Sequence, residues 1–287
     1  MKSIKIFLLI FIFILPLFNC STGSDENGSN ESEELEGNTK AIIADHNSVD
    51  LSSISDEWIV KVKEIIEVHY CHTSHGSQIM TGLERLMDGN FAISIQLSPK
   101  YNYYPDNCNM PDTDLYLSLM DGQYTDGYCE TYVSPDLYWE SDHGLSLTRN
   151  MLNNHNVNVS MFAWCSQLDY YSSSDVENYL NKMEALEKEF PDVVFVYMTG
   201  NAQSGERNRY ERNNQIRQYC KDNNKVLFDF ADLDCWYNGE QYTEDGIPME
   251  HPHYNGDEAG HTTYNSCENK AKAFWWLMAR ISGWDGN

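Results

Sequence analysis

Apolar residues along the chain recur at two spacings, one typical of strands and the other typical of helices. Residues 157–164 and 193–198 are short apolar-rich runs, and the second is continuous, as expected for a parallel strand buried on both faces. Between them, apolar positions at helical spacing predict a helix that begins at an N-cap, Asp175, and ends at Phe190. The same reasoning predicts a helix over 208–221, a strand over 226–230 and a helix over 271–281.

The segment before residue 90 follows the same pattern, with one boundary left open. Residues 59–70 are rich in apolar side chains and predict a strand, and 77–87 carry apolar residues at helical spacing. Positions 59, 62, 65 and 66 fit equally well a helix that precedes a short strand at 67–71. In both cases a strand leads through a polar turn into the helix at 77–87.

Strands separated by helices in this order predict an α/β fold of three layers, with a central parallel sheet covered by helices on both faces. Residues from about 90 to 154 interrupt the pattern because they are rich in Tyr, Asp and Pro. We therefore expect a long irregular insertion there, over one end of the sheet, within a single domain that spans 41–287.

The first 40 residues differ from the rest of the chain. A basic start is followed by an apolar run over 6–18, which indicates an export signal over 1–19, directly before Cys20. A cysteine in this place resembles the lipobox of bacterial lipoproteins, in which the cysteine becomes the lipid-carrying N-terminus. An uncleaved anchor helix is the alternative, although the run is shorter than a membrane span needs.

After Cys20, residues 21–40 are mostly Ser, Gly, Asn, Asp and Glu with a single aliphatic residue, Leu35, so we expect an acidic tether over 20–40 without a fold of its own. Acidic residues after a lipidated cysteine resemble the surface-export signals of Bacteroidota lipoproteins. This resemblance implies an exported domain that a lipid anchors to the outer membrane, at the cell surface.

Composition and charge narrow the choice of partner. The 287 residues are 41% hydrophobic, which is enough for a sizeable core, and the formal net charge is -25. A surface this acidic repels phosphate backbones, so we expect no nucleic-acid partner. We expect a monomer that needs no cofactor and acts on a small molecule or a glycan ester.

The cysteines carry a prediction of their own. Export to an oxidising compartment makes the seven cysteines other than Cys20 candidates for disulfides, and an odd number leaves at least one of them free. Cys108 and Cys129 bracket a loop rich in Gly, Asp and Tyr, so we expect these two to form a bridge.

Polar side chains gather where the predicted strands end, which is where ligands bind in open α/β sheets. A hydroxyl nucleophile, a base, an orienting carboxylate and amide donors are among them, and these are the parts that acyl transfer requires. The residues are His72, Ser74 and His75 after the first strand, Cys165 and Ser166 after the second, Gly200 and Asn201 after the third, and Asp257, Glu258 and His261 before the last helix.

In this order the motifs resemble those of the SGNH (GDSL-like) hydrolase superfamily, over roughly 59–88 and 157–282. The resemblance implies a flavodoxin-like sandwich in which Ser74 is the nucleophile and His261 the base. Glu258 or Asp257 would hold the imidazole of His261, and the choice between these two acids stays open. The family's Gly-Asp-Ser reads His-Thr-Ser here.

The resemblance also implies an oxyanion hole. Asn201, next to Gly200, would supply one donor, and Cys165 or Ser166 stands where the family has a glycine. His72 and His75 would flank the nucleophile and orient the substrate.

Each feature has a simpler interpretation. Ser74 could only cap the following helix, and Asn201 could only be a turn residue. The histidines could instead hold zinc, although their spacing matches no known zinc pattern; they are His72, His75, His251, His253 and His261. Asp-rich stretches at 112–114 and 121–122 hint weakly at calcium.

Aromatic residues of the insertion could form a platform for sugar rings or simply a small core of their own. They are Tyr101, Tyr103, Tyr104, Tyr116, Tyr124, Tyr128, Tyr132, Tyr138 and Trp139. The sequence therefore predicts an exported serine esterase or deacylase that cleaves an ester, on a glycan if the platform exists. The alternatives are a non-catalytic glycan-binding lipoprotein with the same fold and a metal-dependent hydrolase.

Overall fold

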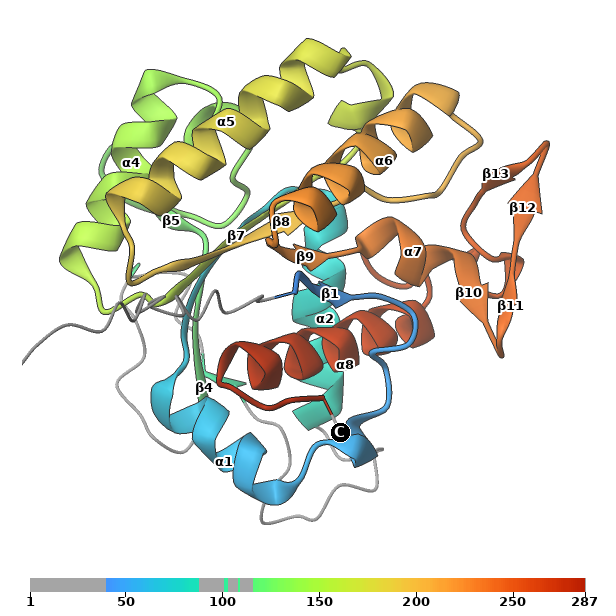
Figure 1. Cartoon of the computed structure of the whole chain (residues 1–287), viewed down its shortest axis with the longest axis horizontal. Helices are drawn as coiled ribbons and strands as arrows, with labels where there is room; N and C mark the ends of the chain where they lie inside the picture. The colour runs from blue at the N-terminus through green and yellow to red at the C-terminus, as the bar shows by residue number, and fades with distance from the viewer. Residues whose placement is uncertain (1–39, 88–100, 103–107, 109–115, 287) are drawn as a thin grey trace, which may run out of the picture. The chain divides into compact units, whose positions relative to one another are not determined.

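A parallel β-sheet forms the centre of the molecule (Figure 1), a computed structural model that describes residues 40–87, 101–102, 108 and 116–286. Within these residues the sheet has seven strands in the order β1-β9-β8-β7-β2-β4-β3, and every neighbouring pair is parallel. The strands are β1 (Ile42–Ala44), β2 (Glu67–His72), β3 (Tyr101–Asn102), β4 (Leu117–Asp121), β7 (Val159–Ala163), β8 (Val194–Met198) and β9 (Val226–Phe228). The predicted α/β class with a central parallel sheet is confirmed.

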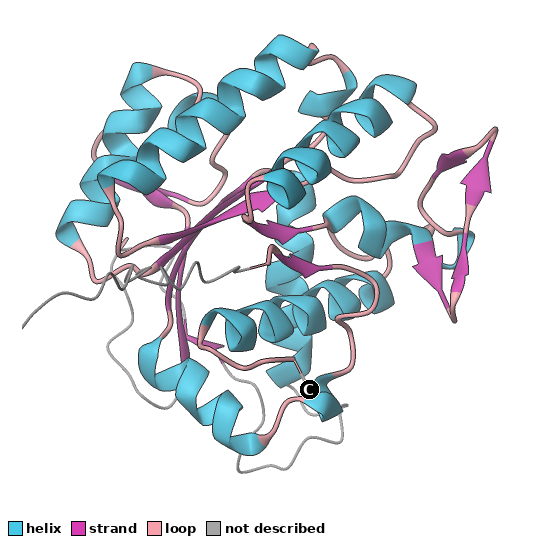
Figure 2. Cartoon of the chain, in the orientation of Figure 1, coloured by secondary structure: helices cyan, strands magenta, loops and turns pink. Residues whose placement is uncertain are grey.

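Helices cover both faces of this sheet (Figure 2). One side carries α1 (Asp56–Ile65), α2 (Ser77–Met87) and α8 (Tyr264–Ile281), and the other carries α4 (Asp142–Asn154), α5 (Ser173–Glu189) and α6 (Arg207–Asp222). Each places an apolar stripe on the sheet, as Val176, Tyr179 and Met183 do in α5. There are two short helices: α3 (Pro135–Tyr138) precedes α4, and α7 (Phe230–Cys235) follows the last strand of the central sheet, β9.

Short hairpins and single helical turns complete the described chain. Three two-stranded antiparallel sheets pair β5 (Gln123–Thr125) with β6 (Tyr128–Glu130), β10 (Trp236–Tyr237) with β11 (Glu240–Gln241), and β12 (Thr243–Glu244) with β13 (Ile247–Pro248). The 3-10 turns are η1 (Leu51–Ser53), η2 (Ser74–Gly76), η3 (Gln167–Asp169) and η4 (Pro252–Tyr254).

Several predicted boundaries change. Residues 59–65 belong to α1 and not to a strand, and β2 follows directly after the C-cap of this helix. The alternative of a helix followed by a short strand near 67–71 is therefore confirmed. Asp175 is not the N-cap of α5: Ser172 is, and Asp175 completes a capping box by bonding back to the Ser172 backbone. Helix α8 begins at Tyr264, seven residues before the predicted start, because Thr263 caps it.

The predicted insertion at 90–154 is only partly irregular. Strand β4 lies inside the sheet beside β2, all five of its residues are buried, and α4 packs over the sheet. The prediction of an insertion that merely sits over the sheet is therefore wrong for this part. The Asp-rich stretch at 112–114 lies outside the described residues.

The predicted bridge between Cys108 and Cys129 is confirmed, and it ties the chain before β4 to the hairpin β5–β6. Cys71, Cys165, Cys220, Cys235 and Cys267 are free thiols. The predicted export signal, Cys20 and the tether lie outside the described residues. Among the residues that are described, no helix is long and apolar enough to cross a membrane.

Candidate active site at the carboxyl edge of the sheet

Three adjacent strands bring the candidate residues together. Ser74 and His75 follow β2, Cys165 follows β7, and Gln203 comes after β8, so all four lie beyond the carboxyl ends of neighbouring parallel strands. This is the position at which open α/β sheets bind ligands. Residues 90 to 128 positions apart in sequence thus contact one another directly.

The thiol of Cys165 is the centre of these contacts. Its Sγ lies 3.0 Å from Ser74 Oγ and 2.9 Å from His75 Nδ1. On the far side of the same imidazole, Nε2 lies 2.6 Å from Gln203 Oε1. Gln203 Oε1 is an acceptor, so Nε2 carries a hydrogen, and Nδ1 either accepts a hydrogen bond from the thiol or, in the doubly protonated ring, donates one to a thiolate. The arrangement is a cysteine beside a histidine, with a carboxamide behind it, and it can form a thiolate–imidazolium pair.

The electrostatics of the pair agree with this geometry. Burial raises the pKa of Cys165, but hydrogen bonds from His75 and Ser74 together with the charge of His75 outweigh burial and lower the pKa to about 6. Burial lowers the pKa of His75, and its hydrogen bonds to Cys165 and Gln203 raise it by more, so the net shift is upward. A thiolate at neutral pH is the nucleophilic form of cysteine.

Local sequence fixes Ser74 at this edge. Ser74 begins η2 directly after the extended Thr73, and its carbonyl accepts a hydrogen bond of 2.6 Å from Ser77 Oγ. Gly76 is required because a Cβ there would lie 2.2 Å from His72 Cβ. Tyr70 Oη donates to the Gly76 carbonyl at 2.8 Å. The turn after β2 is thus packed so tightly that the half-buried Ser74 side chain has a defined direction.

His261 reaches the same region from the opposite end of the chain. A Cβ on Gly260 would lie 3.2 Å from Ser74 O, so the residue before His261 packs against the Ser74 backbone. The His261 ring is 5.0 Å from the ring of His75, and its carbonyl accepts a hydrogen bond from Gln203 Nε2. Gly260 and His261 have φ values of 55° and 71°, the positive pair of a type I′ turn, and hydrogen bonds between the backbones of Ala259 and Thr262 close this turn.

The two acids proposed to orient His261 have different surroundings. Glu258 Oε2 accepts a hydrogen bond of 2.8 Å from Tyr264 N and so caps the start of α8. Asp257 is exposed, and its carboxylate has no hydrogen-bond partner among the described residues. Neither acid is bonded to the His261 ring, which makes only the ring contact with His75 within the described part of the chain.

The predicted oxyanion donors are largely engaged. Asn201 Nδ2 donates to Cys165 O at 2.9 Å, and its Oδ1 accepts from Arg209 at 2.6 Å. Gly200 N donates to Asn213 Oδ1 at 2.8 Å. The backbone N–H of Cys165 donates to Gln167 Oε1 at 2.7 Å, and the neighbouring Ser166 is exposed. Asn201 is 1% exposed and therefore positions the Cys165 loop, and the second hydrogen of its Nδ2 has no bond among the described residues.

The histidines do not converge on one point. His72 Nδ1 donates to Thr73 O at 2.8 Å, and its Nε2 lies 2.9 Å from Asp121 Oδ1, whereas His75 faces Cys165 and Gln203. The arrangement that could hold a metal ion, among the described residues, is instead Asp45, His46 and Asp232, whose ligand atoms lie within 4.8 Å of one another. In that group His46 Nδ1 already bonds Asp232 Oδ2 at 2.5 Å.

A buried charge cluster lies beneath the loop that carries His261. Lys270 Nζ lies 2.6 Å from Asp234 Oδ1, with the two side chains 0% and 2% exposed. Glu250 accepts a hydrogen bond of 2.9 Å from Thr262 Oγ1, next to His261. Burial and the charge of Asp234 raise the pKa of Glu250 to about 7. The cluster ties the loop to α8.

The predicted aromatic platform divides into two parts. Tyr138 and Trp139 are fully buried and belong to the core, as the simpler interpretation expected. Tyr124, Tyr128 and Tyr132 are each more than half exposed. The side chains of Tyr101, Tyr103 and Tyr104 lie outside the described residues, and Tyr116 is half-buried.

Cys165 and His75 were both predicted at this edge of the sheet, but their mutual contact and the contact with Gln203 were not. The signal was present, because Gln203 follows a predicted strand within three residues of Gly200. No protein-family model matches the chain, and no curated protein matches it either. The geometry of the site is therefore the basis for a functional assignment.

Proposed function

We propose that this chain is an ester hydrolase of the SGNH-like, flavodoxin-like kind, with Ser74 as nucleophile and His261 as base. The observation that carries the proposal is the close packing of the Gly260–His261 turn against the Ser74 backbone. The backbone hydrogen bonds between Ala259 and Thr262 fix the shape of this turn, and the turn carries a histidine at the rim near a half-buried serine.

The chemistry follows from these positions. Ser74 Oγ attacks the ester carbonyl carbon and passes its proton to the His261 ring, which turns toward Ser74 when a substrate binds. The oxyanion accepts hydrogen bonds from the Ser74 N–H, at the start of η2, and from the remaining Nδ2 hydrogen of Asn201. His261 then protonates the leaving alcohol, and water hydrolyses the acyl-serine by the reverse sequence.

Of the two candidate acids, Asp257 is assigned the role of holding His261. Its carboxylate is unengaged among the described residues, whereas Glu258 already caps α8. The Cys165–His75 pair lies beside the nucleophile, and Ser74 Oγ is 3.0 Å from Sγ. The proposal extends to location: the enzyme is exported, anchored through Cys20, and acts on esters outside the cell.

A second candidate is acyl transfer to Cys165 itself. It is favoured by the chain of contacts from Cys165 Sγ through the His75 ring to Gln203 Oε1, since a thiolate, a histidine and an orienting amide are what a cysteine nucleophile requires. In this alternative Ser74 only donates a hydrogen bond to the thiolate.

Turnover of p-nitrophenyl acetate by the purified full-length chain separates the two. If Ser74 is the nucleophile, Ser74→Ala lowers kcat/KM by at least about a thousandfold and Cys165→Ala lowers it far less. The reverse order of losses assigns the nucleophile to Cys165. Ser174→Ala, an exposed serine in α5, is the matched control and keeps native turnover. Turnover that survives both site variants contradicts the proposal.

A further inference from the structure

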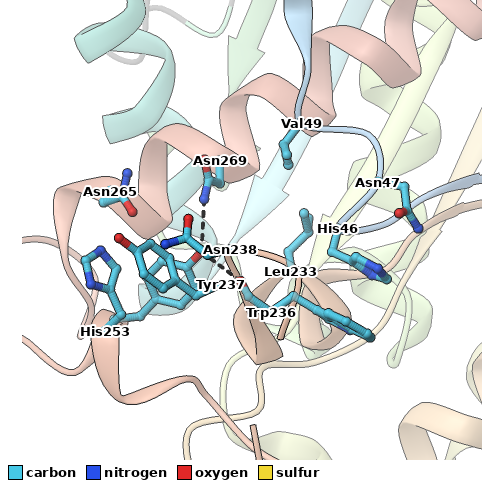
Figure 3. Close-up of a pocket in the computed structure, with 12 residues that line it drawn as sticks. His46, Asn47, Val49, Leu233, Trp236, Tyr237, Asn238, His253, Asn265 and Asn269 are labelled. Carbon is cyan, nitrogen blue, oxygen red and sulfur yellow. Dashed lines mark hydrogen bonds between the residues drawn. The ribbon is translucent and has the colours of Figure 1, made fainter. Parts of the chain in front are cut away.

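A pocket of about 590 Å³ lies apart from the Ser74 site, at the end of the sheet formed by β1 and β9 (Figure 3). Its volume falls in the range of about 300–1,000 Å³ that is usual for small-molecule sites. Five segments supply its wall: the loop after β1, α7, the hairpin β10–β11, the η4 turn and the first turns of α8.

Two stacked ring pairs give the pocket rigid aromatic surfaces. Trp236 stacks on His46 with ring centres 4.0 Å apart and planes 8° apart, and Tyr237 stacks on His253 at 3.6 Å and 17°. Trp236 Nε1 donates to Asp232 Oδ1 at 3.2 Å, and this bond fixes the indole. Flat, fixed rings provide apolar contact area at little cost in conformational entropy.

The hairpin that carries these rings is itself well defined. Asn238 and Gly239 form its two-residue turn with φ values of 50° and 81°. Positive φ at both central residues is the type I′ turn, and Asn-Gly is the dipeptide that favours it most. The adjacent Trp236 backbone is held as well, because Tyr254 Oη donates to its carbonyl at 2.8 Å.

Carboxamides complete the lining, and charged side chains are missing from it. Asn265 and Asn269 lie one turn apart on α8, and Asn47 and Asn238 come from the two loops (Figure 3). The amides of Asn238 and Asn265 have no hydrogen-bond partner among the described residues. Although the chain has 44 acidic and 19 basic residues, none of the lining residues is Asp, Glu, Lys or Arg.

We propose that this pocket binds a neutral saccharide. Sugar rings present apolar C–H faces, which pack on the rings of Trp236 and Tyr237, and hydroxyl groups, which bond amides that both donate and accept. A charged ligand would find no carboxylate, ammonium or guanidinium group among the lining side chains, and an apolar one would leave the amides unsatisfied. The proposal concerns binding alone, so it stands independently of catalysis at Ser74.

Isothermal titration of the full-length chain with neutral tetrasaccharides of glucose, xylose, mannose and N-acetylglucosamine tests the proposal. We expect saturable binding of at least one of them. Asn265→Ala removes an amide that has no structural bond to lose, and it lowers the affinity about tenfold. Trp236→Ala lowers the affinity by at least as much, and Tyr170→Ala, an exposed tyrosine outside the pocket lining, leaves it unchanged.

Two results overturn the proposal: no neutral tetrasaccharide binds to the folded chain, or one binds and both pocket variants keep native affinity. Binding restricted to an acidic oligosaccharide such as tetragalacturonate overturns it too. The Ser74→Ala variant keeps the expected saccharide affinity, so failure of the proposed catalysis and failure of the saccharide site give different results.

Discussion

The pairing of Cys165 with His75 gives the sharpest quantitative prediction. With a pKa of about 6, the thiol is about 90% thiolate at pH 7, whereas the ordinary value of 9.0 would leave about 1%. His75→Ala removes the imidazolium and its hydrogen bond, so we expect the midpoint of thiol ionisation to rise by about 1–3 pH units. Ser74→Ala removes one hydrogen bond and no charge, so its shift is in the same direction and smaller.

The assay is the rate of alkylation by iodoacetamide between pH 4.5 and 10, followed by mass spectrometry on the peptide that carries Cys165. The midpoint of the profile is the informative quantity, because a thiolate of higher pKa is intrinsically more nucleophilic and partly offsets its lower population at pH 7. Burial raises the pKa of Cys267 to about 11, which makes this thiol an internal control that stays unreactive at neutral pH.

A native midpoint near 9, or a midpoint that His75→Ala does not move, would refute the thiolate–imidazolium pair. A pair that interacts this closely titrates as a unit, so the midpoint is assigned to the pair and not to either group alone.

Three further predictions concern stability. Burial raises the pKa of Glu250 to about 7, so the native state holds this proton more tightly than the unfolded chain does and loses stability as the pH rises from about 4.5 to 7. Glu250→Gln should therefore melt a few degrees above the native chain at pH 8, and at the same temperature as the native chain at pH 4. A variant that melts at the same temperature as the native chain at pH 8 as well as at pH 4 would contradict this prediction. Lys270→Ala leaves the buried Asp234 unpaired and should cost about 3–5 kcal/mol in urea unfolding, and a loss below 1 kcal/mol would show that the pair contributes little. Replacing Cys108 and Cys129 by Ser opens a loop with a sequence separation of 21 and should lower the free energy of urea unfolding by about 3 kcal/mol. A double variant that unfolds at the native urea midpoint would contradict this.

The regular helices and buried strands could be predicted because their patterns are local. The continuous apolar run that became β8 and the periodic face of α5 are examples. Strand β4 could not be found in the same way, since Leu117–Asp121 alternates with polar residues that only its neighbours in the sheet bury. The start of α8 was missed because its first turns are polar, and tertiary contacts such as that of Lys270 with Asp234 stabilise them.

The candidate site, too, could be predicted only where local sequence patterns determine it. The strand ends predicted that Ser74 and Cys165 lie on one edge, because carboxyl ends of parallel strands meet there. The contact of His75 with Cys165 and Gln203 depends on how side chains turn across neighbouring strands, which spacing does not reveal. The pocket lined by Trp236 and Tyr237 could not be predicted either: Asn238-Gly239 indicates a hairpin turn, but the pocket also needs residues of the loop after β1 and of α8.

The measurement that tests the central claim most directly is labelling of the full-length chain with a fluorophosphonate probe, followed by peptide mapping. Fluorophosphonates form stable adducts with activated serines, so we expect the label on Ser74 and expect it to disappear in His261→Ala while the variant remains folded. No adduct on Ser74 in a folded chain, or a Ser74 adduct that forms at the native rate in His261→Ala, would contradict a serine nucleophile activated by His261.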